Sequence, residues 1–222
     1  MNSAAFALVV NIAVAGLFAA SFAVIALANP GYRRVLGFSA SYAIGMMTPL
    51  SELLLPLSPW PEPFMVTSYF CFFCGLLGMA AALSCFYGRQ PPWTLLAAML
   101  AAAAATRWLI WGGQRNSLGY ELAYQMPFAL AAALSAWVVL RASRRGRLDM
   151  VLAGMFGLIA LHFLVKPFLA GFFGSGRTAR DYIDSFYALL SQSSTGILLT
   201  AAGLVILLNT VHGVHSLDGV LI

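Results

Sequence analysis

Charged residues are scarce in this chain. They make up 9% of its 222 residues, whereas typical soluble domains carry roughly 25%. So few charged side chains cannot cover the surface of a soluble domain, because much of the 61% of residues that are hydrophobic would then face water. The composition therefore argues against a soluble globular domain and favours an integral membrane protein.

Residues and motifs that carry common chemistry are also missing. The three cysteines provide no disulfide framework, and the C-x-x-C pair Cys71 and Cys74 lies in an apolar segment without further ligands, so we interpret it as structural. His212 and His215 lack a third ligand, so no metal site is predicted. No phosphate-binding glycine loop, nucleophile elbow or HExxH motif occurs. We therefore expect a protein that is not an enzyme, and its cofactors, if any, are unknown.

Long apolar segments dominate the sequence instead. About 20 apolar residues in a helix cross the hydrocarbon core of a bilayer, and seven segments meet this length, with glycine or proline between them. The predicted spans are residues 4–28, 35–56, 64–87, 93–111, 119–140, 149–173 and 183–210. The sequence therefore predicts an all-α fold, one integral membrane seven-transmembrane-helix bundle over residues 1–210, followed by a short cytoplasmic tail, residues 211–222.

The formal net charge of +5 comes from arginines in short loops. Seven follow the first, third and fifth spans: Arg33, Arg34, Arg89, Arg141, Arg144, Arg145 and Arg147. The loops after the second, fourth and sixth spans hold three: Arg115, Arg177 and Arg180. The positive-inside rule therefore predicts the N-terminus outside and the C-terminus in the cytoplasm. We expect Arg141, Arg144, Arg145 and Arg147 to contact lipid headgroups. No basic stripe with interleaved aromatic residues is present, so no nucleic-acid partner is expected.

Ionisable side chains inside the predicted spans are site candidates, because a charge in the hydrocarbon core is costly. On the predicted topology they share the outer half of the membrane with Pro49, Pro127 and Pro167, which free backbone carbonyls. We predict a polar cavity, open to the outside and lined by the second, fourth, fifth, sixth and seventh spans. Its candidate ligand-binding residues are Glu52, Arg107, Glu121, Gln125, His162, Lys166 and Asp184.

The same residues also suit structural roles. Glu52 could pair with Lys166 or Arg107 to hold helices together. The hydroxyl-rich run 191–195 is typical of hydrogen bonding between membrane helices, although it would also suit a binding site. A retinal Schiff base on Lys166 is disfavoured. In microbial rhodopsins the retinal-binding lysine belongs to the last helix and aspartates lie on the third, and this sequence has neither feature. From the sequence, structural pairing and ligand binding both stay open.

Several motifs resemble those of a known family. They are Tyr32-Arg33-Arg34, Thr48-Pro49-Leu50 with Glu52 and Pro56, Trp137 to Arg141 with Arg144-Arg145, Leu161 to Phe168, Gly174-Ser175-Gly176 through Asp181-Tyr182, and Tyr187 to Ser193. On these motifs, residues 1–210 resemble the seven-helix membrane sensor modules that precede diguanylate cyclase (GGDEF) domains in alphaproteobacteria. The resemblance implies a sensory bundle in the bacterial inner membrane, whose last helix passes a signal to a cytoplasmic domain. It assigns no ligand to Glu52, His162 or Lys166.

The chain departs from that pattern after the seventh span. It contains no GGDEF signature, so it is not expected to make cyclic di-GMP, and Gly213 and Gly219 disfavour a stiff helical extension. Two functions stay open. One is a non-enzymatic sensor-like module that binds a small amphiphilic ligand in the outer-half cavity, and the other is an accessory or scaffold subunit of a larger membrane complex, for instance an energy-transducing one. Expected partners are membrane lipids, a second copy or other membrane proteins. A transporter is less favoured because no inverted repeat is visible.

Overall fold

A computed structural model of the protein describes residues 3–113, 117–142, 146–174 and 185–218. These residues form seven α-helices and two 3₁₀ helices, with no strand among them, so the predicted all-α fold is confirmed. The α-helices are α1 (Ser3–Ala28), α2 (Leu36–Leu54), α3 (Pro61–Phe86), α4 (Trp93–Leu109), α5 (Leu118–Leu140), α6 (Arg147–Phe173) and α8 (Phe186–Asp218). The 3₁₀ helix η1 (Pro30–Val35) precedes α2, and η2 (Leu55–Leu57) follows it.

Five of these helices are long and apolar enough to cross a membrane: α1, α3, α5, α6 and α8 as far as His212. The apolar helix α4 is shorter, with 17 residues, and the 19-residue α2 is not among the five. Large apolar side chains lie on the outside of the bundle, and Leu27 and Phe172 are 77% and 90% exposed. Soluble proteins rarely expose apolar surface on this scale, so the architecture is that of a helical membrane bundle.

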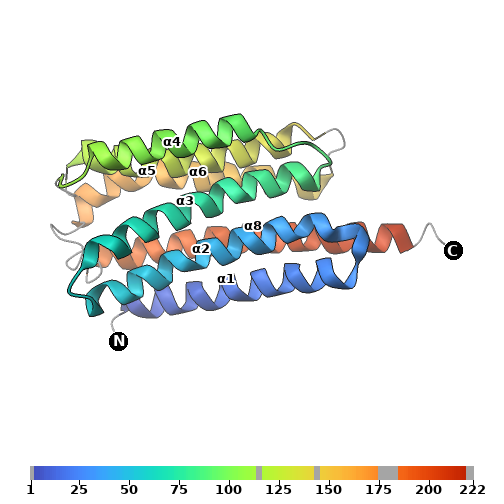
Figure 1. The fold of residues 1–222 in the computed structure, drawn as a ribbon, viewed down its shortest axis with the longest axis horizontal. Coiled ribbons are helices and arrows are strands. Elements are labelled where there is room, and N and C mark those ends of the chain that lie inside the picture. Colours follow the sequence, from blue (N-terminus) through green and yellow to red (C-terminus); the bar gives the residue numbers. More distant parts are fainter. Residues whose placement is uncertain (1–2, 114–116, 143–145, 175–184, 219–222) are drawn as a thin grey trace.

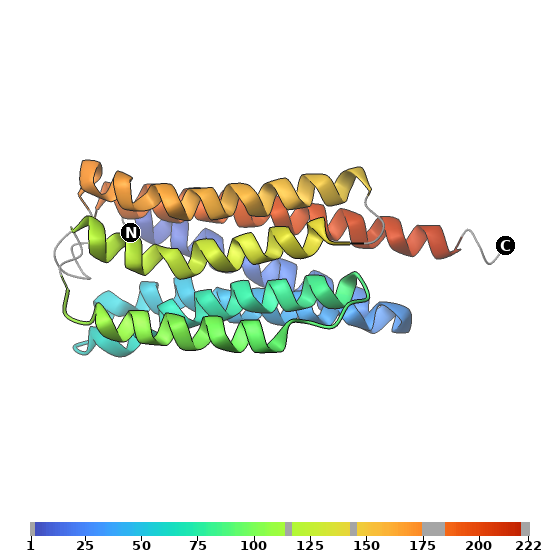
Figure 2. The same cartoon turned by 90° about the horizontal axis from the view of Figure 1, so that it is seen from above.

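Six of the α-helices form a closed ring. α1 packs on α2, α2 on α3, α3 on α5, α5 on α6, α6 on α8, and α8 returns to α1. The seventh, α4, lies at the edge of the bundle against α5 and α3 (Figures 1 and 2). Only Leu96, Ala103 and Arg107 of α4 are buried. The interior of the molecule is therefore the interior of the six-helix ring.

The helices run along the long axis of the molecule and alternate in direction (Figure 1). We call the end where α1 begins the N-terminal end of the bundle and the opposite end the C-terminal end. α8 projects beyond the other helices at the C-terminal end. It continues through Gly213 to Asp218, so Gly213, which was expected to disfavour a stiff extension, does not end the helix. A single glycine costs a helix only about 1 kcal/mol. Gly219 lies outside the described residues.

Small residues bring α2 and α3 close together. Gly37, Ser41 and Gly45 are spaced four residues apart on α2, which places them on one face of the helix. Gly75 and Gly78 of α3 lie against that face: a Cβ on Gly75 would be 3.2 Å from the Gly45 Cα and from the Ser41 carbonyl oxygen. This spacing of small residues lets membrane helices pack backbone against backbone.

Candidate ligand-binding cavity

A polar cavity of about 90 Å³ lies inside the ring. Side chains from α2, α3, α5, α6 and α8 line it, and they include two carboxylates, one ammonium group and several amides and hydroxyls. Four of the predicted site residues are among them: Glu52, Glu121, Gln125 and Lys166. A polar cavity of this size has room for a few water molecules or for the polar part of a small ligand.

Glu52 connects three helices through its carboxylate. Its Oε1 accepts a hydrogen bond from the Ser68 hydroxyl of α3 at 2.9 Å, and its Oε2 accepts one from the Gln192 side-chain amide of α8. The Ser68 carbonyl in turn accepts a hydrogen bond from the Thr48 hydroxyl, one turn earlier on α2, at 3.2 Å. Hydrogen bonds to a carboxylate offset part of the cost of removing its charge from water. Glu52 is therefore a polar link between α2, α3 and α8.

Lys166 is the only lysine in the chain, and it is buried in α6. Its Nζ donates a hydrogen bond to Thr195 Oγ1 of α8 at 2.8 Å and lies 4.8 Å from the centre of the Phe163 ring. The carboxylates of Glu52 and Glu121 are close enough to attract its charge. Because an ammonium group has three N–H donors, Lys166 is well suited to bind a ligand oxygen within the cavity.

His162 lies one turn before Lys166 but does not line the cavity. Its Nε2 is 3.2 Å from Thr195 Oγ1 and 3.4 Å from Ser194 Oγ. Thr195 therefore contacts both His162 and Lys166. The run 191–195 hydrogen-bonds between helices and also contributes to the cavity lining, so the two sequence-based interpretations of this run are compatible.

Two parts of the predicted lining are wrong. α3 lines the cavity and α4 does not, because α4 lies outside the ring. Arg107 of α4 is buried elsewhere, with its guanidinium 4.8 Å from the centre of the Trp111 ring, and its Nε atom has no hydrogen-bond partner among the described residues. The seventh predicted residue, Asp184, lies outside the described residues.

A second cavity, also of about 90 Å³, adjoins the polar one and is mainly apolar. It lies among α1, α2, α3 and α8, and it shares Thr48, Phe72, Gln192 and Thr195 with the polar cavity. One layer of side chains therefore separates the two. Gly45 borders the apolar cavity, and a Cβ at this position would meet nothing within 4 Å. The missing side chain at Gly45 therefore leaves part of this space open.

Another polar cluster lies at the C-terminal end of the bundle. The carboxylate of Asp149, near the start of α6, accepts hydrogen bonds from the Tyr87 hydroxyl (2.6 Å), the Asn209 side-chain amide (2.6 Å) and the Gly146 N–H (2.7 Å). Sequence reasoning missed this cluster, although an acidic residue in the first turn of a helix signals a capping role. It anchors α8 at Asn209, about four turns or more along the helix from the α8 residues that line the polar cavity.

Two of the four arginines predicted to contact lipid headgroups belong to the described part of the chain, and both lie at the C-terminal end of the bundle. Arg141 and Arg147 are exposed there, and Arg144 and Arg145 lie outside the described residues. Cys71 and Cys74 are free thiols on α3. No group of three or more metal-binding side chains is found within the described part of the chain.

No protein-family model, curated protein or solved structure matches this chain. The fold and the cavities therefore define only a class: a helical membrane protein whose helix ring encloses a polar cavity beside an apolar one.

Proposed function

We propose that the chain is a non-enzymatic, sensor-like membrane module that binds a small amphiphile inside its helix ring. The observation that carries this proposal is that two cavities adjoin each other. One is polar and is lined by Lys166 and Glu52, and the other is mainly apolar and is bordered by Gly45. A ligand head would lie beside Lys166 and its tail beside Gly45. Gln192 and Thr195 of α8 line both cavities. For the head and the tail of one ligand to bind at the same time, these two side chains would rotate.

The charges of the polar cavity favour an uncharged head. Glu52 and Glu121 would repel an anion, and Lys166 would repel a cation. A hydroxyl group satisfies both kinds of partner, because it accepts a hydrogen bond from an ammonium group and donates one to a carboxylate. An apolar cavity of about 150 Å³ holds a benzene molecule, so two adjoining cavities of about 90 Å³ each suit a short amphiphile such as 1-hexanol.

The proposal also covers the membrane setting. We infer seven spans in the bacterial inner membrane, with the N-terminus outside and the polar cavity in the outer half. The arginine distribution and the resemblance to cyclase-associated sensor modules support this arrangement. α8 would carry a signal along the bundle, since it contacts Glu52 and Lys166 near one end and Asp149 near the other.

Binding can be measured at Lys166 directly. Because the chain has one lysine, labelling with lysine that is ¹³C-enriched at Cε gives one NMR signal in a lipid nanodisc. We expect 1-hexanol to shift that signal saturably, since its hydroxyl enters the cavity beside Nζ. Hexanoate is expected to bind at least about tenfold more weakly, because two carboxylates face its head. A shift that rises linearly with hexanol, without saturation, reports partition into lipid and would contradict the proposal.

Filling the apolar cavity provides an independent test. Gly45→Leu places a side chain in the space that the tail would occupy, so we expect it to weaken hexanol binding at least about tenfold. Gly157→Leu is the matched control, since Gly157 is exposed on α6 and has open space around it. The measurement is the same lysine signal, which both variants retain. Equal hexanol affinity in the two variants would exclude the apolar cavity as the tail site.

A further inference from the structure

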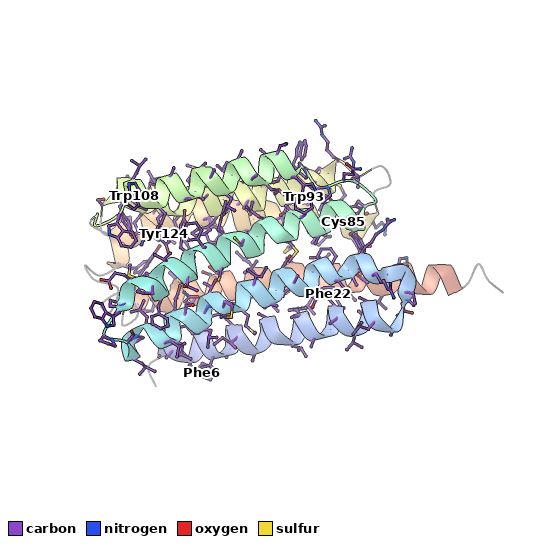
Figure 3. The ribbon with its side chains drawn as sticks, in the orientation of Figure 1. Phe6, Phe22, Cys85, Trp93, Trp108 and Tyr124 are labelled. Carbon is purple, nitrogen blue, oxygen red and sulfur yellow. The ribbon has the colours of Figure 1, made fainter. Side chains whose placement is uncertain are left out.

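A pocket of about 400 Å³ lies near the C-terminal end of the bundle, between the end of α3, the segment that connects α3 to α4 and the end of α5. Arg89, Gln90, Trp137 and Arg141 are among its lining residues. In Figure 3 the labelled Cys85 and Trp93 lie toward this end, whereas Tyr124, which lines the polar cavity, lies toward the other. The pocket is therefore separate from the proposed ligand cavity.

We infer that this pocket binds the phosphate group of an anionic phospholipid. Among the described residues, its lining contains two arginines and no acidic residue, so its net positive charge favours an anion. Each guanidinium group has five N–H donors. Arg89 Nη1 uses one of its donors on the Arg141 carbonyl oxygen at 2.8 Å, which ties the two residues together. The remaining donors can form the forked hydrogen bonds with which arginine binds phosphate.

The surroundings of the pocket favour a lipid over free phosphate. Trp137 is half-exposed, and the Arg141 guanidinium stacks on its ring at 4.5 Å. Trp93, at the start of α4, is 66% exposed. Tryptophan is enriched at the depth of lipid headgroups, where helix ends lie in a spanning bundle. Exposed leucines on α4 and α5, such as Leu95 and Leu130, provide an apolar surface along which acyl chains can lie.

Lipid retention by the full chain tests this inference. The protein is purified from nanodiscs that contain equal amounts of phosphatidylglycerol and phosphatidylcholine, and bound lipids are counted by native mass spectrometry. We expect selective retention of phosphatidylglycerol. Each surface arginine contributes about 1 kcal/mol of attraction to an anionic membrane, or roughly fivefold in affinity. Arg141→Gln should therefore weaken retention about fivefold, and Arg89→Gln with Arg141→Gln by more than about tenfold.

Arg141→Gln keeps the bond from Arg89, because the acceptor is a backbone carbonyl. This variant tests binding with the loop contact intact if the double variant fails to fold. Arg33→Gln is the control, since Arg33 is exposed at the same end but does not line the pocket. It should retain phosphatidylglycerol as the wild type does.

Three results would overturn the inference. One is equal retention of the two lipids by the wild type. A second is an equal loss in Arg33→Gln and Arg141→Gln, which indicates diffuse attraction to the surface. The third is displacement of the lipid by millimolar inorganic phosphate, which indicates a site for the free ion. None of these results depends on hexanol binding in the ring.

Discussion

Glu52→Ala is expected to lower the free energy of unfolding by about 2–4 kcal/mol. The carboxylate accepts hydrogen bonds from Ser68 and Gln192 and attracts Lys166. Its removal would take the acceptor from the Ser68 hydroxyl and the half-buried Gln192 amide, and buried Lys166 would lose one of its two neighbouring carboxylates. Unpaired polar groups are costly inside a membrane bundle. Unfolding of the purified chain in mixed micelles, followed by circular dichroism during an SDS titration, measures the change.

Two further variants separate the polar link from simple loss of volume. Glu52→Gln keeps an oxygen that accepts one hydrogen bond but loses the charge. Its free energy of unfolding should therefore lie between those of the wild type and Glu52→Ala. Glu62→Ala is the control, because Glu62 is exposed in the first turn of α3, and stability should be nearly unchanged. If Glu52→Ala and Glu62→Ala have the same effect, Glu52 does not link the helices as described.

Gly75→Leu is expected to destabilise the bundle by about 3 kcal/mol or more, because the new side chain would enter a contact between two backbones. The nearest atoms to a Cβ at this position are the Gly45 Cα and the Ser41 carbonyl oxygen, each at 3.2 Å. A flexible side chain could rotate away, but a helix backbone cannot. α2 and α3 would therefore have to separate, and the Thr48 and Glu52 contacts with Ser68 would weaken with them.

The same unfolding measurement checks this prediction. Gly75→Ala should cost less, since a single methyl group requires a shift of only a few tenths of an ångström. Gly157→Leu again serves as the control: it meets open space, and leucine has the higher helix propensity by nearly 1 kcal/mol. Stability should be unchanged or slightly increased. Wild-type stability in Gly75→Leu would show that α2 and α3 do not pack as closely as the structure indicates.

The positions of the helices could be predicted from the sequence alone. Apolar segments bounded by glycine and proline placed each helix end within three residues, apart from the end of α8. The segment beyond residue 210 contains polar residues and Gly213, so hydropathy ended the span there, whereas backbone hydrogen bonding continues the helix to Asp218. Hydropathy reports what a bilayer can hold, and a helix can extend beyond that limit.

The polar cavity could be predicted in part. Glu52, Glu121 and Lys166 lie together, with Gln125 beside them. Charged side chains avoid the hydrocarbon core, and the same reason had marked these charged residues as site candidates in the sequence. That argument could not distinguish Arg107, which is equally charged but belongs to α4. It also overlooked Ser68, because serine is common in membrane helices and has no charge to mark it.

The amino-acid sequence by itself determined that this is an all-helical membrane protein and which segments form its helices, because both follow from local hydrophobicity and backbone hydrogen bonding. Only the tertiary structure decided that α4 lies outside the ring, that α3 lines the polar cavity, and that an apolar cavity adjoins it. Each helix is apolar on most of its surface, so periodicity does not distinguish the side that faces lipid from the side that faces its neighbours. That choice depends on contacts between distant small residues, such as Gly45 and Gly75, and on polar links such as Glu52 with Gln192.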